Sequence, residues 1–247
     1  MIEIKGYLKN TARALGIYLA CIDRLGIDLE LDLARLTKGD SLMTIFDVGG
    51  NFGQTTCRFA SAFPDATIFT FEPVPTSFER LLEATKDKTR VRAFNVALGD
   101  SSGIVQMNLT PDAGLNSIMN VQSSQSKVEV QIERLDKIAN DSDITMIDLL
   151  KIDVEGYELK VLEGAEQFLK EGRIRFVYAE CIFSPNAEMP HVSFFDLNQV
   201  LEKTGFCFVN YYAESFNLRL GYAQGNVLYA LRSKLPKHVQ GHVKNIS

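Results

Sequence analysis

The stretch from Thr44 to Gln54, with the sequence TIFDVGGNFGQ, constrains the fold more than any other part of the chain. It begins with β-branched and aromatic residues, which predict a buried strand. Three glycines follow, and glycine permits a tight turn and a close approach of a ligand to the backbone. Residues 55 to 63 then predict a helix with one apolar side. A strand, a glycine turn and a helix in this order are typical of the first unit of a nucleotide-binding α/β fold.

The spacing of these glycines differs from that of a dinucleotide-binding turn. Such a turn, started at Gly49, would need glycine in place of Asn51 and Gln54. Asp47 ends the strand near the place where a dinucleotide puts its pyrophosphate, and two negative charges there would repel each other. An aspartate suits a ligand that presents a cation. S-adenosylmethionine (SAM) carries an ammonium and a sulfonium, so the turn is typical of SAM-dependent methyltransferases, with an unrelated α/β protein as the alternative.

Two later stretches add acidic residues at strand ends. Residues 67 to 71 predict a second strand, which ends at Glu72. Glu72 follows Gly53 at close to the spacing of about 20 residues at which an acid accepts the ribose hydroxyls of a nucleotide. Residues 144 to 154 predict a further apolar strand, which ends in acidic residues at Asp153.

With these stretches in view, the chain resembles the FkbM family of SAM-dependent methyltransferases, over about residues 44 to 182. Three motifs carry the resemblance in the same order: Asp-Val-Gly-x-Asn-x-Gly at 47–53, Phe-Glu-Pro at 71–73, and Lys-Ile-Asp-Val-Glu-Gly at 151–156 with Glu158. The resemblance implies a SAM-dependent O-methyltransferase that transfers a methyl group to a hydroxyl of a small molecule or a glycan, with a sugar or a polyketide-like compound as acceptor.

Two other function classes stay open. One is an NAD-dependent oxidoreductase, because dinucleotide-binding folds begin with the same kind of unit. The other is a non-catalytic SAM-fold interaction module that acts as a scaffold through its N-terminal helices. The acids at 47, 72 and 153 count against that module, because a protein without a ligand gains nothing from burying them.

We expect an α/β fold of the Rossmann-like class I methyltransferase type: a doubly wound, mostly parallel sheet with helices on both faces. Residues 91 to 98 predict its third strand. Residues 158 to 170 predict a helix, and residues 174 to 179 predict the fifth strand, which ends at Glu180. Residues 104 to 109 and 127 to 132 predict an inserted antiparallel hairpin. We divide the chain into an N-terminal helical extension over 1–40, a SAM-dependent methyltransferase domain over 41–232 and a polar tail over 233–247.

The N-terminal extension has a regular apolar pattern. Apolar residues recur mostly every three or four positions from Leu8 to Leu36, so residues 3 to 37 predict one or two amphipathic helices. Residues 14 to 22 also resemble the apolar core of a signal peptide, but the pattern continues past any cleavage point. We therefore expect these helices to pack on the domain or on a partner subunit in a homodimer.

Composition excludes several partners. The net charge of −5 argues against binding of nucleic acid. The Asn/Asp-Pro-Pro-Tyr/Phe motif of enzymes that methylate base amines is replaced here by residues 153 to 156.

The four cysteines lack Cys-x-x-Cys spacing, so neither a zinc site nor a disulfide framework is indicated, and a cytoplasmic location is the simpler interpretation. No apolar run approaches the about 20 residues of a membrane span.

Cofactor-binding residues are expected at the carboxyl ends of the strands, where doubly wound sheets bind ligands. Ala97 and Leu98 end the predicted third strand and could present their backbone to the adenine, although an ordinary strand end is an equal alternative. The candidates are Asp47, Gly49, Asn51, Gly53, Glu72, Ala97, Leu98 and Asp153.

Methyl transfer to an alcohol also needs a proton acceptor. The candidate catalytic residues are Asp153, Glu155, Glu180 and His191. We expect Asp153 to contact both cofactor and acceptor. Glu155 could instead cap the following helix, and His191 could be packed in a loop. Lys151 is expected to form a structural ion pair with one of the acids.

A divalent metal is the last possibility weighed. Asp153, Glu155 and Glu180 offer hard oxygen ligands that would suit Mg²⁺. Acidic residues are common at strand ends without any metal, so the sequence does not favour Mg²⁺ and assigns no metal ligand. The cofactor predicted from the sequence is SAM.

Overall fold

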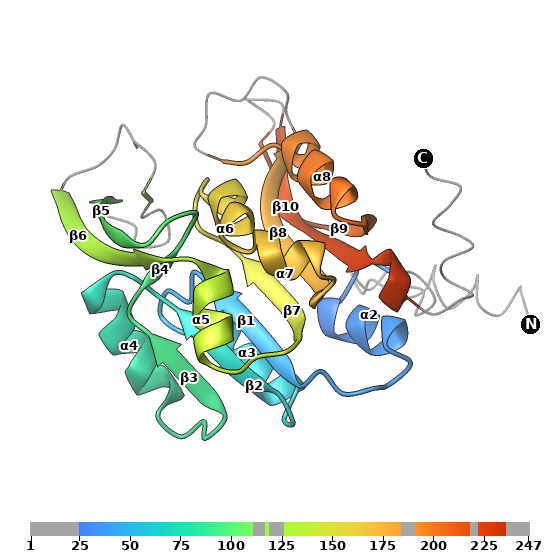
Figure 1. Ribbon diagram of the computed structural model, residues 1–247, viewed down its shortest axis with the longest axis horizontal. Coiled ribbons are helices and arrows are strands. Elements are labelled where there is room, and N and C mark those ends of the chain that lie inside the picture. Colours follow the sequence, from blue (N-terminus) through green and yellow to red (C-terminus); the bar gives the residue numbers. More distant parts are fainter. Residues whose placement is uncertain (1–24, 111–116, 119–125, 184–190, 218–221, 236–247) are drawn as a thin grey trace, which may run out of the picture.

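The computed structural model describes residues 25–110, 117–118, 126–183, 191–217 and 222–235. Its centre is a seven-stranded sheet with the order β3-β2-β1-β7-β8-β10-β9 (Figure 1). The strands are β1 (Thr44–Val48), β2 (Thr67–Phe71), β3 (Val91–Phe94), β7 (Ile147–Ile152), β8 (Ile174–Phe183), β9 (Phe206–Asn217) and β10 (Tyr222–Leu231). All neighbouring strands pair in parallel except at β10, which is antiparallel to both β8 and β9. The predicted doubly wound, mostly parallel sheet is confirmed.

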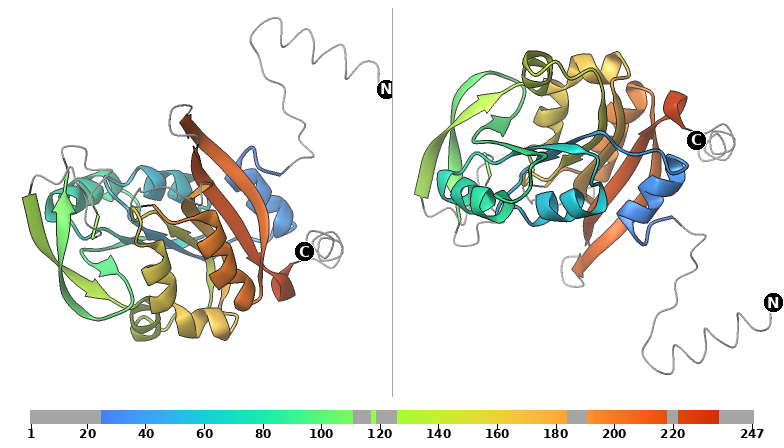
Figure 2. Two further views of the ribbon diagram at one scale, coloured as in Figure 1. Left: turned by 90° about the horizontal axis from the view of Figure 1, so that it is seen from above. Right: turned by 90° about the horizontal axis from the view of Figure 1, so that it is seen from below.

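Helices cover both faces of this sheet (Figure 2). One face carries α2 (Leu29–Leu36) and α3 (Gln54–Ala62), with α4 (Pro75–Thr85) beside α3. The other face carries α5 (Leu135–Asp141), α6 (Glu158–Gly164), α7 (Glu166–Lys170) and α8 (Phe194–Lys203). A short 3-10 helix, η2 (Arg232–Lys234), follows the last strand.

Strand alternation divides the core into two layers. On β1, Ile45 packs into the layer of α2 and α3, whereas Phe46 and Val48 pack into the layer of α5 to α8. Because the central strands are buried on both faces, their sequences are nearly continuous apolar runs. Asp47 and Lys151 interrupt these runs, and both are almost fully buried.

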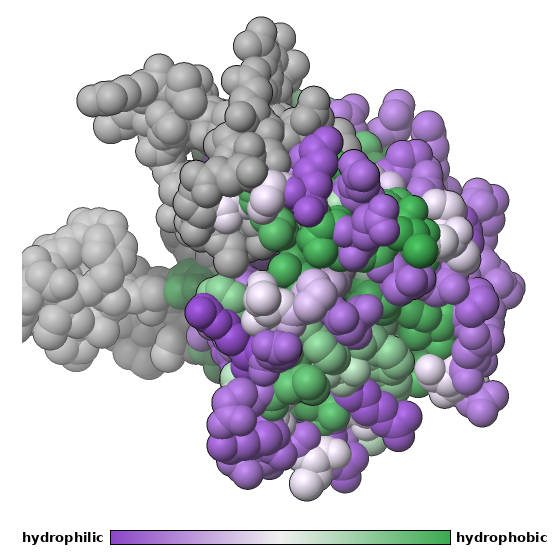
Figure 3. Space-filling model, turned by 90° about the vertical axis from the view of Figure 1, so that its left-hand side faces the viewer, coloured by the Kyte–Doolittle hydropathy of each residue, from purple (hydrophilic) through white to green (hydrophobic). Residues whose placement is uncertain are grey.

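A second, three-stranded sheet lies beside the main one, with the order β4-β6-β5. Its strands are β4 (Ala97–Leu98), β5 (Gly103–Leu109) and β6 (Ser126–Glu133), and the predicted antiparallel pairing of β5 and β6 is confirmed. The face that holds β5, β6 and α4 mixes hydrophobic with hydrophilic side chains (Figure 3), and Ile104 and Leu82 are among the exposed large hydrophobic residues.

The prediction of one strand over residues 91 to 98 was wrong. β3 ends at Phe94, and Ala97 and Leu98 pair with β6 in the second sheet. The side chain of Asn95 explains the break, because its Nδ2 donates hydrogen bonds to the carbonyl oxygens of Glu72 and Pro73 at 2.8 and 2.9 Å. These bonds hold the chain that follows β3 against the segment that follows β2.

Three further elements differ from the expected pattern. Helix α5 was not predicted. The helix predicted to start at Glu158 is divided into α6 and α7 at Ala165. Glu180 does not end its strand, because β8 continues to Phe183 and pairs Glu180 with Asn226 of β10.

Helix α2 packs on the domain itself. Asp28 caps it by accepting a hydrogen bond from the backbone of Leu31, and the side chain of Leu33 within the helix is fully buried. Tyr212 of β9 donates a hydrogen bond of 2.7 Å to Asp32 of α2. The rest of the predicted N-terminal helices, in residues 1–24, and most of the polar tail lie outside the described residues. Within the described ranges, no helix is both long enough and apolar enough to cross a membrane.

Candidate functional site

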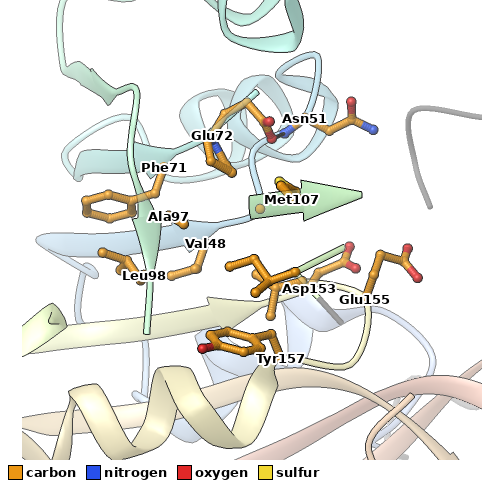
Figure 4. A pocket seen from close by; sticks show the side chains of 14 residues that line it. Val48, Asn51, Phe71, Glu72, Ala97, Leu98, Met107, Asp153, Glu155 and Tyr157 are labelled. Atoms are coloured by element: carbon orange, nitrogen blue, oxygen red, sulfur yellow. Dashed lines mark hydrogen bonds between the residues drawn. The ribbon is translucent and has the colours of Figure 1, made fainter. Parts of the chain in front are cut away.

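A pocket opens at the carboxyl ends of β1, β2 and β7, next to the second sheet (Figure 4). Its empty volume is about 750 Å³, counting the solvent at its open mouth, which is within the range of small-molecule sites. The residues that line it are Val48, Gly49, Asn51, Phe71, Glu72, Pro73, Ala97, Leu98, Met107, Ile118, Asp153, Val154, Glu155 and Tyr157. Six of the eight predicted cofactor residues therefore line one pocket, and Asp47 and Gly53 do not.

The glycine turn forms the part of the pocket surface that lies between the ends of β1 and β7. The backbone N–H groups of Gly49 and Gly50 both donate to the carbonyl oxygen of Phe71, at 3.0 Å each. Gly49 has φ +81°, and a Cβ there would lie 1.8 Å from the carbonyl oxygen of Asp153. Only glycine lets the ends of β1 and β7 approach this closely. Gly53 lies at the N-cap of α3, also with positive φ.

Asp47 lies beneath this turn and not in the pocket. Its carboxylate is fully buried, 3.1 Å from Lys151 Nζ, and accepts a hydrogen bond of 2.6 Å from Thr56 Oγ1. Lys151 also donates to the carbonyl oxygen of Gly49 at 2.9 Å. The structural ion pair predicted for Lys151 is present. Asp47, a predicted cofactor residue, contacts Lys151 and does not line the pocket, because strand alternation turns its side chain toward α3.

Lys151 joins two acids. Its Nζ lies 3.4 Å from Asp153 Oδ2 as well as close to Asp47. Burial alone would lower the pKa of Lys151, but the two carboxylates outweigh that effect and raise it. Lys151 is therefore a fixed cation that supports both the glycine turn and Asp153.

Glu72 is held at one side of the pocket. Its two carboxylate oxygens accept hydrogen bonds of 2.9 Å from the backbone N–H groups of Asn51 and Val74. Burial raises the pKa of Glu72 to about 7, against the opposing effect of these two bonds. Asn51 adopts φ +46° at this point of the turn. Each oxygen of Glu72 keeps a further lone pair, so the carboxylate can accept two neighbouring hydroxyl groups.

Asp153 and Glu155 lie at the opposite side of the pocket from Glu72 and Asn51 (Figure 4). The side chain of Asp153 is 40% exposed, more than the side chains of Glu155 and Glu180, so it is accessible to a ligand. Its backbone N–H donates to the carbonyl oxygen of Val48. The expectation that Asp153 faces the ligand agrees with this position.

The loop between β7 and α6 is held by Glu158. Its Oε1 accepts hydrogen bonds from the backbone N–H groups of Val154 and Gly156, at 3.1 and 3.2 Å. Burial raises the pKa of Glu158 to about 7. Glu155 has φ +52° within this loop, and its carbonyl oxygen accepts a hydrogen bond of 2.6 Å from Ser117 Oγ. Glu158 thus positions the loop. The third motif included Glu158, but the sequence did not predict this role.

Three of the predicted catalytic residues meet beside the pocket. His191 Nδ1 lies 3.8 Å from Glu155 Oε2 and 4.0 Å from Glu180 Oε2. Gln224 donates a hydrogen bond of 2.8 Å to the other oxygen of Glu180. Burial lowers the pKa of His191, with the charge of Asp153 opposing the shift, so its imidazole is neutral near pH 7. Glu155, Glu180 and His191 therefore form one cluster, whereas Asp153 pairs with Lys151.

The sequence did not identify three further side chains of the pocket wall, those of Met107, Ile118 and Tyr157. Alternation along β5 could have placed Met107 on the same face as Val105 and Leu109, and all three contact one small core with Ala97 and Ile132. No short-range signal connects that face with β1.

Taken together, the pocket offers an acid for vicinal hydroxyls, apolar walls for a flat ring, and an accessible carboxylate at the far side. Phe71, Ala97 and Leu98 supply the apolar walls. Such a site can bind a nucleoside and hold a second reactant next to Asp153.

Comparison with known proteins gives one family. The model described as the Methyltransferase FkbM domain matches residues 47–208. The 2-O-methyltransferase NoeI of Sinorhizobium fredii is 30% identical over an alignment of 164 residues, and the match covers 60% of this chain and 66% of NoeI. The hexuronic acid methyltransferase AglP of Haloferax volcanii is 30% identical over an alignment of 154 residues, and the match covers 61% of this chain and 62% of AglP. The 31-O-demethyl-FK506 methyltransferase FkbM of Streptomyces tacrolimicus is 29% identical over an alignment of 191 residues, and the match covers 65% of this chain and 69% of that protein. The chain thus spans slightly less than two thirds of the first two relatives.

Proposed function

The chain belongs to the FkbM methyltransferase family, and on this premise we propose that it is a SAM-dependent O-methyltransferase whose acceptor is a hydroxyl group of a small molecule or glycan. The names of the relatives support this acceptor class, since they include a 2-O-methyltransferase and a hexuronic acid methyltransferase. The observation that carries the proposal is the placement of Glu72, the glycine turn and Asp153 around one pocket.

In this proposal SAM lies along the ends of β1, β2 and β7. Glu72 accepts the two ribose hydroxyls, and the adenine lies between the apolar side chains of Phe71 and Leu98. The close approach of Gly49 to the end of β7 leaves bare backbone next to the amino-acid part of the cofactor. The sulfonium methyl group then faces Asp153.

The chemistry follows from this orientation. The acceptor oxygen attacks the methyl carbon in line, so the O–CH₃ bond forms while the S–CH₃ bond breaks and the sulfonium becomes the thioether of S-adenosylhomocysteine (SAH). The proton of the hydroxyl passes to the carboxylate of Asp153. Positioning of the two reactants can supply up to about 7–11 kcal/mol of the barrier, and a general base contributes about 10²–10⁴-fold.

Calorimetric titration tests the cofactor. We expect SAH to bind with one site per chain and NAD not to bind. Binding of NAD without SAH would instead make the protein an oxidoreductase. Incubation of extract fractions with SAM labelled in the methyl group then identifies the acceptor, and SAH binding without transfer to any fraction would leave only a SAM-binding scaffold.

We further propose that the acceptor is not a nucleic acid, which the net charge of −5 supports.

Light scattering of the purified chain tests the proposed homodimer through the N-terminal residues. Limited proteolysis tests the proposed division at residues 40 and 232. A cytoplasmic location is supported by the free cysteines Cys57, Cys181 and Cys207 within the described residues, and cell fractionation tests it.

A further inference from the structure

Glu155, Glu180 and His191 come from three separate segments and converge on one point. Glu155 lies in the loop after β7, Glu180 lies within β8, and His191 precedes α8. One ligand atom from each side chain lies within 4.8 Å of the other two. All three side chains are largely buried, with exposed fractions of 16%, 9% and 7%.

The distances within this cluster are not those of hydrogen bonds. His191 Nδ1 lies 3.8 and 4.0 Å from the nearest oxygens of Glu155 and Glu180, beyond the about 3.2 Å of an N–H···O bond. Two ligands that share one ion at about 2.1 Å each lie about 3 to 4 Å apart, depending on the angle between them. A small inward movement of the side chains would therefore bring all three atoms to bonding distance of one ion.

The carboxylate of Glu180 and the segments that carry Glu155 and His191 are held by neighbouring groups. Gln224 donates to Glu180 Oε1, which leaves Oε2 as the oxygen nearest to His191. The carbonyl oxygen of Glu155 is bound by Ser117. The residue after His191, Val192, accepts a hydrogen bond of 3.0 Å from the backbone N–H of Ile182 in β8. Such preorganisation is what a metal site needs from the residues behind its ligands.

We propose that Glu155, Glu180 and His191 bind a divalent metal ion at the acceptor side of the pocket. Two carboxylates and one imidazole form a mixed oxygen and nitrogen set, which suits Mn²⁺ or Zn²⁺ better than the all-oxygen preference of Mg²⁺. The ligand set differs from the one considered from the sequence, because His191 takes the place of Asp153. Asp153 remains paired with Lys151.

The role of the ion rests on the proposed function, whereas its binding does not. Glu155 lines the pocket and also belongs to the cluster, so the ion would lie beside the acceptor hydroxyl. A bound ion lowers the pKa of a hydroxyl that it contacts. The ion neither accepts the proton nor carries the methyl group. The proton still passes to Asp153, and the methyl group still moves from sulfur to oxygen.

Mn²⁺ is the probe for the experiment, because electron paramagnetic resonance counts its free form directly. After dialysis against EDTA and removal of the chelator, the wild-type chain should bind one Mn²⁺. Glu180→Gln and His191→Ala should each weaken Mn²⁺ binding by at least about tenfold. Glu129→Gln, an exposed change on β6, should leave it unchanged. Circular dichroism confirms that the variants are folded.

A wild-type chain that binds neither Mn²⁺ nor Zn²⁺ at millimolar concentration overturns the site, as does unchanged Mn²⁺ affinity in folded His191→Ala. SAH titration on the same samples keeps the two proposals apart. Loss of SAH binding with Mn²⁺ binding retained would overturn the methyltransferase assignment alone. Full methyl transfer by the metal-free chain would overturn the catalytic role of the ion.

Discussion

Lys151 on β7 lies 3.1 Å from Asp47 on β1, directly opposite it in the strand pairing, and both side chains are buried under the glycine turn. The pair places a positive charge and a negative charge at the centre of the sheet. Since Lys151 also binds the carbonyl oxygen of Gly49 and lies next to Asp153, this buried pair connects the stability of the domain with the shape of its pocket.

Replacing Lys151 with methionine leaves Asp47 buried without its cation. Removal of one partner of a buried pair costs about 3–5 kcal/mol, so urea denaturation should show a loss of that size. Adding Asp47→Asn to this variant should recover part of the loss, because the stranded charge disappears. Lys137→Met serves as the control, since this exposed lysine should not measurably affect stability. An equally small change in Lys151→Met would contradict the structural role of the pair.

Gly49 and Gly39 permit a matched comparison. Both have positive φ, of +81° and +84°, but a Cβ at Gly49 would meet the carbonyl oxygen of Asp153 at 1.8 Å, whereas one at Gly39 has nothing within 4 Å. Gly39→Ala should therefore cost only the about 1–2 kcal/mol of the left-handed backbone and keep its SAH affinity. Gly49→Ala should cost more and abolish SAH binding. Thermal unfolding and calorimetry measure the two effects, and equal behaviour of the variants would argue against the close approach of the strands.

Cofactor affinity should depend on pH through Glu72. Its pKa is about 7 without ligand, and ribose hydroxyls donate to the ionised carboxylate better than to the protonated acid. Binding therefore lowers this pKa. SAH affinity should rise between pH 6 and 8 and fall by up to about tenfold per pH unit below 7. Calorimetry across this range measures it, and Glu72→Gln should bind weakly with a flat profile. A flat profile in the wild type would show that Glu72 does not contact the ligand.

Asp153→Asn separates binding from chemistry. If Asp153 accepts the proton of the acceptor, the amide should keep SAH affinity within about threefold and lower kcat by about 10²–10⁴-fold, since it removes an interaction used only in the transition state. The measurement is a steady-state assay with the identified acceptor beside SAH titration. Asp196→Asn, on the exposed side of α8, is the control with unchanged kcat. Full turnover in Asp153→Asn would reject the catalytic role.

The sequence predicted well what local patterns determine. The strand ending at Val48, the turn and α3 follow from residues that are adjacent in the chain, and Glu72 follows from its spacing. The role of Asp47 depends on the pairing of β1 with β7, and no local pattern shows that Lys151 lies opposite it. The sequence also could not predict that His191 lies next to Glu155 and Glu180, because these residues come from three separate segments that only the folded sheet brings together.

The break after Phe94 shows a different limit. Residues 91 to 98 have the composition of one strand, but two hydrogen bonds from Asn95 fix a corner and send Ala97 and Leu98 into the second sheet. A single polar side chain thus interrupts a run of residues that strand propensity predicts as continuous. This corner also brings Ala97 and Leu98 into the pocket wall.

The bond between Tyr212 and Asp32 spans 180 positions of the chain, and it has a consequence for biosynthesis. A ribosome completes α2 long before it makes β9, so the aspartate emerges without the tyrosine that it binds in the finished domain. The layer that covers the apolar side of α2, which includes Leu33, is incomplete during that time, because part of it comes from β9 and β10. Docking of this helix is therefore completed late in folding, and nascent chains that stop before β9 expose apolar surface that favours aggregation.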